Sequence, residues 1–284
     1  MEADARRGWT LIAPPTLYAV ALLAAPLVTI LIFSFWTQDY LTIDRTPTLA
    51  NYREALSEPL YRALMGRSVI VAGLVTLATV ILAFPVAYYV SFHVPAHRKS
   101  LWLFLITIPF WTSYLLRVFL WKVILGFNGV LNSGLTGLGL IDEPLTFLLY
   151  NANAVVITLA HAFAPFAILP IFVALEKIDR SLLEAARDLG ETAATTFLRV
   201  TLPLAMPGVV AAVLIVFIPT IGDYVTPQLV GGSSGKMIAN MIQTQFLGLN
   251  NQPMGAALAV LAMLSVTVIA LGFVWLTRRW LRAA

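Results

Sequence analysis

Six long apolar segments recur along the chain, and polar stretches that hold most of the charged residues separate them. A membrane-spanning helix needs about 20 predominantly apolar residues, and each segment is long enough to supply one. The pattern predicts spans at residues 9–36, 69–92, 101–125, 151–175, 207–230 and 254–277. A signal peptide is the alternative for the first segment, but its apolar core would be shorter, about 7 to 15 residues. Prolines inside that span predict a kinked or broken helix, at Pro14, Pro15 and Pro26.

Basic residues are shared unevenly among the segments that connect these spans. Cytoplasmic loops of membrane proteins carry an excess of Lys and Arg, which allows the chain to be oriented. The basic groups are Arg6 and Arg7 before the first span, His93, His97, Arg98 and Lys99 after the second, and Arg278, Arg279 and Arg282 after the sixth. We therefore expect both termini in the cytoplasm. An external loop with short helices at 37–67 and the polar segments 128–143 and 231–253 then lie outside.

Composition supports an integral membrane protein. Hydrophobic residues make up 60% of the 284 residues and charged residues 11%, with a mean hydropathy of +0.86. Soluble domains have an apolar content of about half and a charged content of about a quarter. The length leaves room for one six-span membrane domain and little else. The chain has no cysteine, which excludes disulfides and thiolate metal sites, and nothing in it suggests nucleic-acid binding.

The polar insert at residues 176–206 differs from the other connections because it reads as two short helices. Ser181 and Glu184 have the spacing of a capping box, which predicts a helix start at Ser181. Gly190 is expected to end this first helix, since glycine adopts the left-handed conformation of a helix end easily. A second helix, at about 192–200, should end before Leu202 and Pro203. On spacing alone, a solvated connector is the alternative.

Two spans carry polar groups deep in the membrane. Asp223 falls in the outer half of the fifth span, where an ionisable side chain is costly and a functional candidate by default. Its structural alternative is an ion pair with Arg117 or Lys122 of the third span. His161 falls near the middle of the fourth span, where a hydrogen bond between helices is favoured over substrate or proton handling.

The amino-acid sequence of the insert resembles a known motif. Glu184, Ala185, Ala186, Gly190, Leu202 and Pro203 stand at the positions of the EAA motif found in membrane subunits of ATP-binding-cassette (ABC) importers. Val200 departs from it, because isoleucine is more usual there. The resemblance implies an all-α membrane protein with the type I ABC importer permease fold. It also implies that the insert is a cytoplasmic coupling loop seated on an ATPase subunit, with coupling residues Glu184, Ala185, Ala186, Asp188, Gly190, Leu202 and Pro203.

Three further stretches are similar to the spermidine/putrescine branch of these permeases, namely residues 109–117, 128–132 and 222–232. This resemblance implies a bacterial inner-membrane subunit that imports a polyamine. The implied partners are a second, similar permease, two ATPase subunits that use ATP and Mg, and a periplasmic solute-binding protein. This chain would then hold no cofactor and no catalytic residue. Permeases for opines, aminophosphonates or amino-acid-like solutes share parts of these motifs and are alternatives.

A polycation needs carboxylates, carbonyls or aromatic faces along its path, because desolvated ammonium groups must be compensated. The candidates for a substrate path or gate are Asp223, Tyr224, Phe110, Trp111 and Tyr114. An interfacial aromatic belt with anchoring cations is the alternative for the residues of the third span.

Other function classes fit less well. An ion-coupled secondary transporter would more often carry intramembrane charges for coupling and inverted repeats, and neither stands out. A membrane enzyme would need a nucleophile or metal cluster, but the three histidines are scattered. No phosphate-binding glycine loop of the Walker type occurs, so we expect ATP hydrolysis to reside in another chain.

Overall fold

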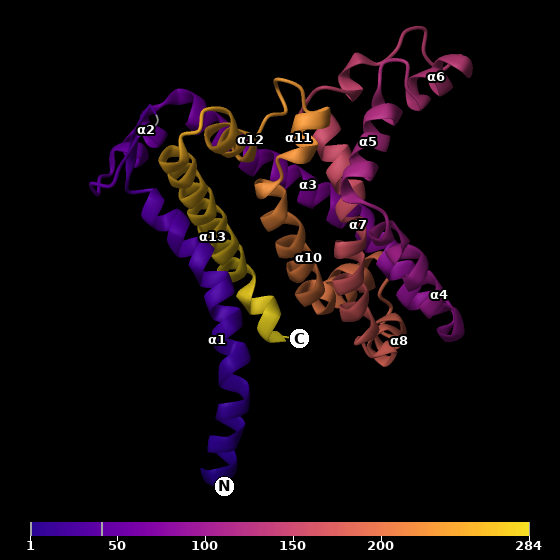
Figure 1. The fold of residues 1–284 in the computed structure, drawn as a ribbon. Coiled ribbons are helices and arrows are strands. Elements are labelled where there is room, and N and C mark those ends of the chain that lie inside the picture. Colours follow the sequence, from indigo (N-terminus) through magenta and orange to yellow (C-terminus); the bar gives the residue numbers. More distant parts are fainter. Residues whose placement is uncertain (1, 41, 284) are drawn as a thin grey trace. The chain divides into compact units, whose positions relative to one another are not determined.

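The structure is a computed structural model that describes the backbone of residues 2–40 and 42–283 and the side chains of residues 11–40 and 42–280 (Figure 1). The predicted cytoplasmic side chains of Arg6, Arg7 and Arg282 lie outside these described residues. The longer elements are α1 (Glu2–Phe33), α3 (Pro59–Phe92), α4 (Ala96–Thr107), α5 (Tyr114–Leu125), α7 (Ala152–Glu176), α10 (Leu202–Gly222) and α13 (Gln252–Ala283). The shorter ones are β1 (Thr37–Asp39), β2 (Thr42–Asp44), α2 (Ala50–Ser57), η1 (Ile108–Trp111), α6 (Val130–Gly137), η2 (Thr146–Leu148), α8 (Arg180–Asp188), α9 (Ala193–Thr196), η3 (Phe197–Thr201), α11 (Val225–Val230), α12 (Ile238–Gln243) and η4 (Thr244–Gly248).

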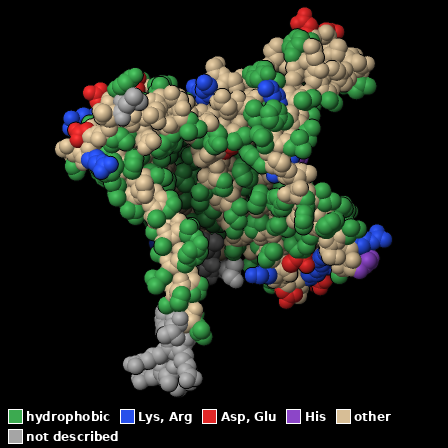
Figure 2. Space-filling view, viewed as in Figure 1, with side chains coloured by type: hydrophobic (Ala, Val, Ile, Leu, Met, Phe, Trp, Pro, Cys, Tyr) green, Lys and Arg blue, Asp and Glu red, His purple; other side chains and the backbone are tan. Residues whose placement is uncertain are grey.

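Within the described residues, six helical segments are long and apolar enough to cross a membrane, as many as the sequence predicted, although the third runs past its predicted end at residue 125. They are Leu11–Phe33, Pro59–Phe92, Tyr114–Gly137, Ala152–Glu176, Ala193–Gly222 and Gln252–Trp280. The first is continuous through its three prolines, so the predicted break is absent. Hydrophobic side chains spread over the outer faces of the helices in Figure 2, whereas charged side chains gather near helix ends and loops. This is the distribution expected of a protein whose solvent is lipid.

Two predicted spans are interrupted. The predicted helix at 101–125 is divided into α4, η1 and α5, because the chain leaves helical geometry at Thr112 after the helix-breaking Pro109. The predicted span at 207–230 ends at Gly222, where Asp223 takes an extended conformation. The Asp223 carboxylate instead accepts hydrogen bonds from the backbone of Val225 and Thr226 at the start of α11. A side chain that offers the backbone such bonds competes with a continuing helix.

The chain forms two compact units. The first comprises residues 1–62 and 241–264 and contains a β1–β2 hairpin that the sequence did not predict. Gln38 of the hairpin connects the two chain segments of this unit, because its side chain donates to the Asn250 carbonyl and accepts from the Gln252 amide. Near it, the Ser34 and Tyr52 hydroxyls lie 2.6 Å apart. The second unit comprises residues 63–240 and 265–284 and holds the elements described below.

Helices α7 and α10 form the centre of the second unit and lie side by side (Figure 1). Asn151 begins α7 by accepting hydrogen bonds from the amides of Asn153 and Ala154, at 2.8 and 3.1 Å. Gly208 of α10 lies directly against α7, and a Cβ there would fall 2.5 Å from the Pro170 carbonyl oxygen. Small residues at a helix contact let two membrane helices approach closely. This contact places the polar insert 176–206 at the shared end of the two central helices.

Candidate functional site

Helix α8 begins at Arg180, and its cap lies two residues before the predicted cap at Ser181. Its N-cap is Asp179, whose Oδ1 accepts from the backbone amide of Ser181 across 3.0 Å. The predicted capping box on Ser181 and Glu184 is therefore wrong, because Asp179, two residues before Ser181, caps the helix instead. This backbone hydrogen bond, with a further one from the Ser181 hydroxyl, lowers the pKa of Asp179 below its ordinary value of 3.8.

Gly190 ends the helix as predicted. Its φ is +86°, and the amides of Gly190 and Glu191 bond back to the carbonyls of Arg187 and Ala186. The neighbouring Leu189 is 86% exposed, so the turn between the two helices of the insert presents an apolar tip. An exposed leucine at such a turn is suited to contact another protein.

The second helix of the insert does not end before Leu202 and Pro203. Helix α9, the π-helical segment η3 and α10 follow one another without a gap, so helical backbone runs from Ala193 to Gly222. In η3 the Leu202 amide bonds to the Phe197 carbonyl, five residues back. The wider π turn accommodates Pro203, which cannot donate a hydrogen bond and whose ring would clash in a regular α-helix. The insert is thus continuous with the fifth span.

Thr192 and Glu191 hold the start of this second helix. The Thr195 amide donates to Thr192 Oγ1 at 3.3 Å, and Arg199 Nη1 forms an ion pair with Glu191 Oε1 at 2.6 Å. A side-chain hydrogen bond from Thr195, and secondly the charge of Arg199, lower the pKa of Glu191. These exposed contacts fix the angle at which the insert turns back.

The predicted coupling residues divide into two groups. Glu184, Ala185, Asp188 and Gly190 are exposed on α8 and its end, while Ala186 is buried. Leu202 and Pro203 are half-buried in the continuous helix that follows. The exposed group forms an accessible surface, whereas Leu202 and Pro203 lie at the start of α10, away from that surface.

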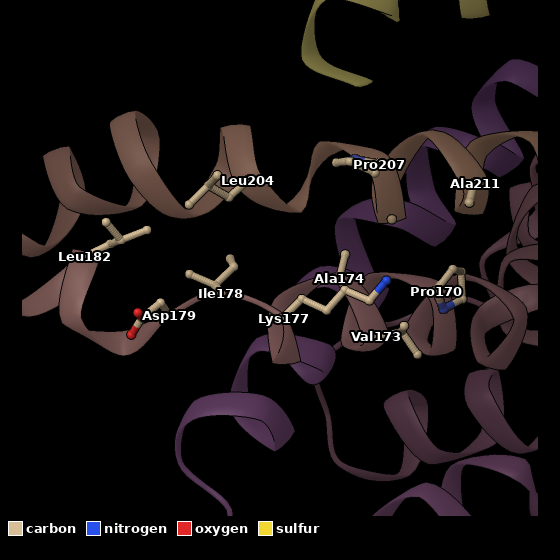
Figure 3. A pocket seen from close by; sticks show the side chains of 11 residues that line it. Pro170, Val173, Ala174, Lys177, Ile178, Asp179, Leu182, Leu204, Pro207 and Ala211 are labelled. Atoms are coloured by element: carbon tan, nitrogen blue, oxygen red, sulfur yellow. The ribbon is translucent and has the colours of Figure 1, made fainter. Parts of the chain in front are cut away.

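A groove that the sequence did not predict lies beside α8 (Figure 3). It measures about 660 Å³ and is lined by Pro170, Val173, Ala174, Lys177, Ile178, Asp179, Leu182, Leu204, Pro207, Gly208 and Ala211. These residues come from the end of α7, from α8 and from the start of α10. In Figure 3 the Lys177 side chain extends along the groove beside Ala174. The small side chains Ala174 and Gly208 were the only sequence signal of this close helix contact.

At the other end of α10, the structure brings together two of the five predicted path residues. Tyr114 donates to Asp223 Oδ2 across 2.7 Å, and its oxygen lies 2.6 Å from Thr226 Oγ1. The predicted alternative, an ion pair of Asp223 with Arg117 or Lys122, is not formed by the described residues. Arg117 instead reaches the Ala162 carbonyl at 3.5 Å and lies over the Tyr114 ring. Asp223 therefore has no bonded cation among the described residues.

The other three path candidates lie near this pair in sequence but make different contacts. Phe110 packs against Phe166 of α7, with ring centroids 4.4 Å apart. Trp111 is 82% exposed, and Tyr224 is 43% exposed while its carbonyl accepts from Asn240. The structure thus brings Tyr114 and Asp223 together, while the other three candidates make separate contacts.

His161 forms the hydrogen bond between helices that the sequence favoured. Trp121 Nε1 of α5 donates to His161 Nδ1 of α7 across 3.0 Å. The Trp121 and His161 rings also pack edge to face, which fixes the contact. Among the described residues, no three His, Asp or Glu side chains come together as metal ligands would.

Comparison with known proteins shows which family shares this sequence and fold. The model of one family, described as the binding-protein-dependent transport system inner membrane component, matches residues 5–282. The chain belongs to this family. Its fold is that of type I ABC importer permeases: the crystal structure of a bacterial ABC transporter involved in alginate import superimposes with a TM-score of 0.72 at 17% identity, covering 98% of each chain.

Relatives within the family share considerably more sequence. The spermidine/putrescine transport system permease protein PotB of Escherichia coli (strain K12) is 38% identical over 228 residues, which cover 80% of this chain and 82% of PotB. The inner membrane ABC transporter permease protein YdcU of the same organism is 36% identical over 256 residues, which cover 85% of this chain and 80% of YdcU. This chain is therefore a multi-pass membrane permease subunit of the binding-protein-dependent family.

Proposed function

We propose that this permease imports a polyamine such as spermidine or putrescine across the bacterial inner membrane. The observation that carries the proposal is the 38% identity to PotB along four-fifths of both chains. The transport of spermidine and putrescine by PotB matches a chemical feature of this chain, namely a carboxylate at the break between α10 and α11 that has no bonded cation among the described residues. A polyamine carries several ammonium groups, and each must exchange water for protein acceptors on entering the membrane.

The pair of Asp223 and Tyr114 is suited to contact one such ammonium group. Asp223 Oδ2 accepts from the Tyr114 hydroxyl, and Oδ1 binds the Val225 amide, so both oxygens are held in place. A preorganised carboxylate has little side-chain entropy left to lose when it binds a cation. The aromatic rings of Tyr114, Tyr224, Phe110 and Trp111 offer further cation contacts on the same elements.

The energy source and the partners belong to the same proposal. ATP and Mg would be bound by two ATPase subunits, a second and similar permease would complete the membrane channel, and a periplasmic solute-binding protein would deliver the substrate. One structural relative, the alginate transporter, has been crystallised with an alginate-bound periplasmic protein. Both termini of this chain would lie in the cytoplasm, with the insert 176–206 on the ATPase side.

The insert would transmit the movement of the ATPase subunits. The surface formed by Glu184, Ala185, Asp188 and Gly190 is exposed, as a docking surface must be. Because helical backbone continues from Ala193 to Gly222, a displacement of the insert would act directly on α10 and on Asp223 at its end. Rocking of the central helices would then expose the substrate path to one side of the membrane or the other.

Uptake by cells tests the proposal. The chain and the products of its neighbouring genes would be expressed in a bacterial strain that lacks polyamine uptake, and the entry of labelled putrescine and spermidine measured. We expect ATP-dependent uptake that excess unlabelled polyamine abolishes. Uptake of an opine, an aminophosphonate or an amino acid in place of polyamines would disprove the substrate, whereas energy-independent or proton-coupled uptake would disprove the ABC mechanism.

A charge reversal tests the docking surface. Glu184 is exposed, and its side chain forms no hydrogen bond or ion pair with the described residues, so Glu184→Lys should leave the fold intact. We expect uptake to fall about tenfold, because reversing a charge at a protein interface weakens binding by about that factor. Glu143→Lys, an exposed charge reversal in the loop after α6, is the matched control and should transport normally. Equal uptake by both variants would remove Glu184 from the coupling surface.

A further inference from the structure

The turn between α7 and α8 is held to α3 at both of its ends by one residue, Ser91. The Ser91 hydroxyl donates to Oε1 of Glu176, the last residue of α7, across 2.7 Å. The Ser91 carbonyl accepts from Nη2 of Arg180, the first residue of α8, across 3.3 Å. Ser91 itself is only 1% exposed. The start of α8 therefore cannot shift relative to the end of α3 unless these bonds rearrange.

Helix α4 joins the same point through Lys99. Its Nζ donates to the Glu176 oxygen that Ser91 also contacts, and the Lys99 and Glu176 side chains are 14% and 34% exposed. Separating partly buried ionic partners is costly, because each is left desolvated without compensation. We call Ser91, Lys99, Glu176 and Arg180 the base cluster. It links α3, α4, α7 and α8 although none of its members belongs to the EAA motif.

The elements that leave the base cluster run to the opposite end of the second unit. Helix α4 is followed by η1 and, after the break at Thr112, by α5, whose first residue Tyr114 donates to Asp223. From Glu176, helix α7 runs back past its close contact with Gly208 of α10 to His161, which accepts the hydrogen bond from Trp121. A movement of α8 thus has two bonded routes away from the insert, one through α4 and one through α7.

We propose that the base cluster is the joint that passes movement of α8 to α3 and α4, and that Glu176 is its positioning residue. This inference rests on the proposed function, since coupling requires an ATPase partner. In the alternative, the same contacts only stabilise the fold. The two differ in one quantity: a joint changes how much substrate is moved per ATP hydrolysed, whereas a purely structural contact changes only how much transporter assembles.

The experiment uses the complete transporter, with its partner subunits, reconstituted in liposomes. Labelled substrate uptake and ATP hydrolysis are measured in the same vesicles for Glu176→Gln, Lys99→Gln and Ser91→Ala. We expect uptake per ATP to fall about fivefold in the first two variants, the size typical of broken network couplings. Arg98→Gln is the matched control: Arg98 adjoins Lys99 on α4, is exposed, and forms no side-chain hydrogen bond or ion pair with the described residues. It should leave uptake per ATP unchanged.

Exchanging the charges gives a second readout. Glu176→Lys alone places two cations together, and the double variant Lys99→Glu with Glu176→Lys restores opposite charges. We expect the double variant to recover uptake per ATP above either single variant. If Glu176→Gln does not assemble, Ser91→Ala carries the test, because it removes one hydroxyl and leaves the ion pair in place.

Three results would overturn the inference. Unchanged uptake per ATP in every assembled variant would show that the base cluster is no joint. Failure of all variants to assemble would assign it to stability alone, and an equal loss in Arg98→Gln would show a general charge effect. Failure of the proposed function is separate from these, because the unmodified transporter would then show no ATP-dependent uptake in the same vesicles.

Discussion

Asp223 uses its two carboxylate oxygens for two different purposes. Oδ1 accepts the amide hydrogens of Val225 and Thr226 and so begins α11, while Oδ2 accepts the Tyr114 hydroxyl. The sequence identified this residue by its depth in the fifth span, yet it could not show the cap, because a cap depends on where the helix stops. The same bonds that hold the carboxylate in place also allow its charge to be tested without destroying the fold.

Asp223→Asn separates the charge from the cap. Asparagine keeps an oxygen for the Val225 amide, so we expect normal assembly. Loss of the charge should raise the polyamine concentration for half-maximal uptake about tenfold, since a hydrogen bond to a charged group contributes about 1.5–3 kcal/mol. Asp142→Asn, on an exposed acid of the outer loop, serves as the control. Indistinguishable uptake curves for the two variants would exclude Asp223 from the path.

Asp179 gives a pH-dependent prediction for the start of α8. Hydrogen bonds from Ser181 lower its folded-state pKa below 3.8, so its capping contribution is present above that value and is lost as the pH falls through the lowered pKa. The protection factor of the Ser181 amide, which is corrected for the pH dependence of intrinsic exchange, should therefore fall in strong acid and stay constant near neutral pH. Asp179→Asn caps without a charge, so its protection should lack this acid step. A matching acid step in the variant would assign the effect to another group.

At the level of elements, the sequence predicted which helices exist better than where they stop. Gly190 was predicted correctly because a positive φ at a helix end strongly favours glycine. Pro203 was misinterpreted, because proline usually ends a helix, but here the π turn at Phe197–Thr201 absorbs it. A π turn shifts the apolar pattern by only about one residue, which periodicity does not reveal in so short a segment. The Asp223–Tyr114 pair and the groove beside α8 likewise depend on contacts between distant segments.

The contact between α7 and α10 is the element-level feature with the sharpest steric requirement. A Cβ at Gly208 would lie 2.5 Å from the Pro170 oxygen and 2.6 Å from the Ala174 Cβ. Gly208→Ala should therefore force the two helices apart and destabilise the protein by about 1–3 kcal/mol. In Gly73→Ala, where nothing lies within 4 Å of the added Cβ, the substitution should be neutral or stabilising. Thermal unfolding of both variants in detergent measures the difference, and equal midpoints would contradict the packing.

At the scale of the whole molecule, orientation follows from charge. Arg98 and Lys99 lie in α4, Lys177 follows α7, and Arg180 and Arg187 lie in α8, whereas the loop after α6, residues 138–151, has no Lys or Arg. The positive-inside tendency therefore predicts that the insert 176–206 faces the cytoplasm and that the loop after α6 lies outside. The groove, the base cluster and the docking surface would all face the ATPase subunits, and Asp223 would face the side from which substrate arrives.

The absence of cysteine makes this orientation directly measurable. Single cysteines introduced at Leu189 and at Leu138, which are 86% and 76% exposed, would be the only thiols of the chain. A membrane-impermeant thiol reagent added to intact cells should label Leu138→Cys and spare Leu189→Cys, because only the former would face outward. After the cells are opened, both should react, which controls for local access to each thiol. Labelling of Leu189→Cys in intact cells would place the insert outside, where no ATP-hydrolysing partner could act on it, and the proposed coupling would fail as a whole.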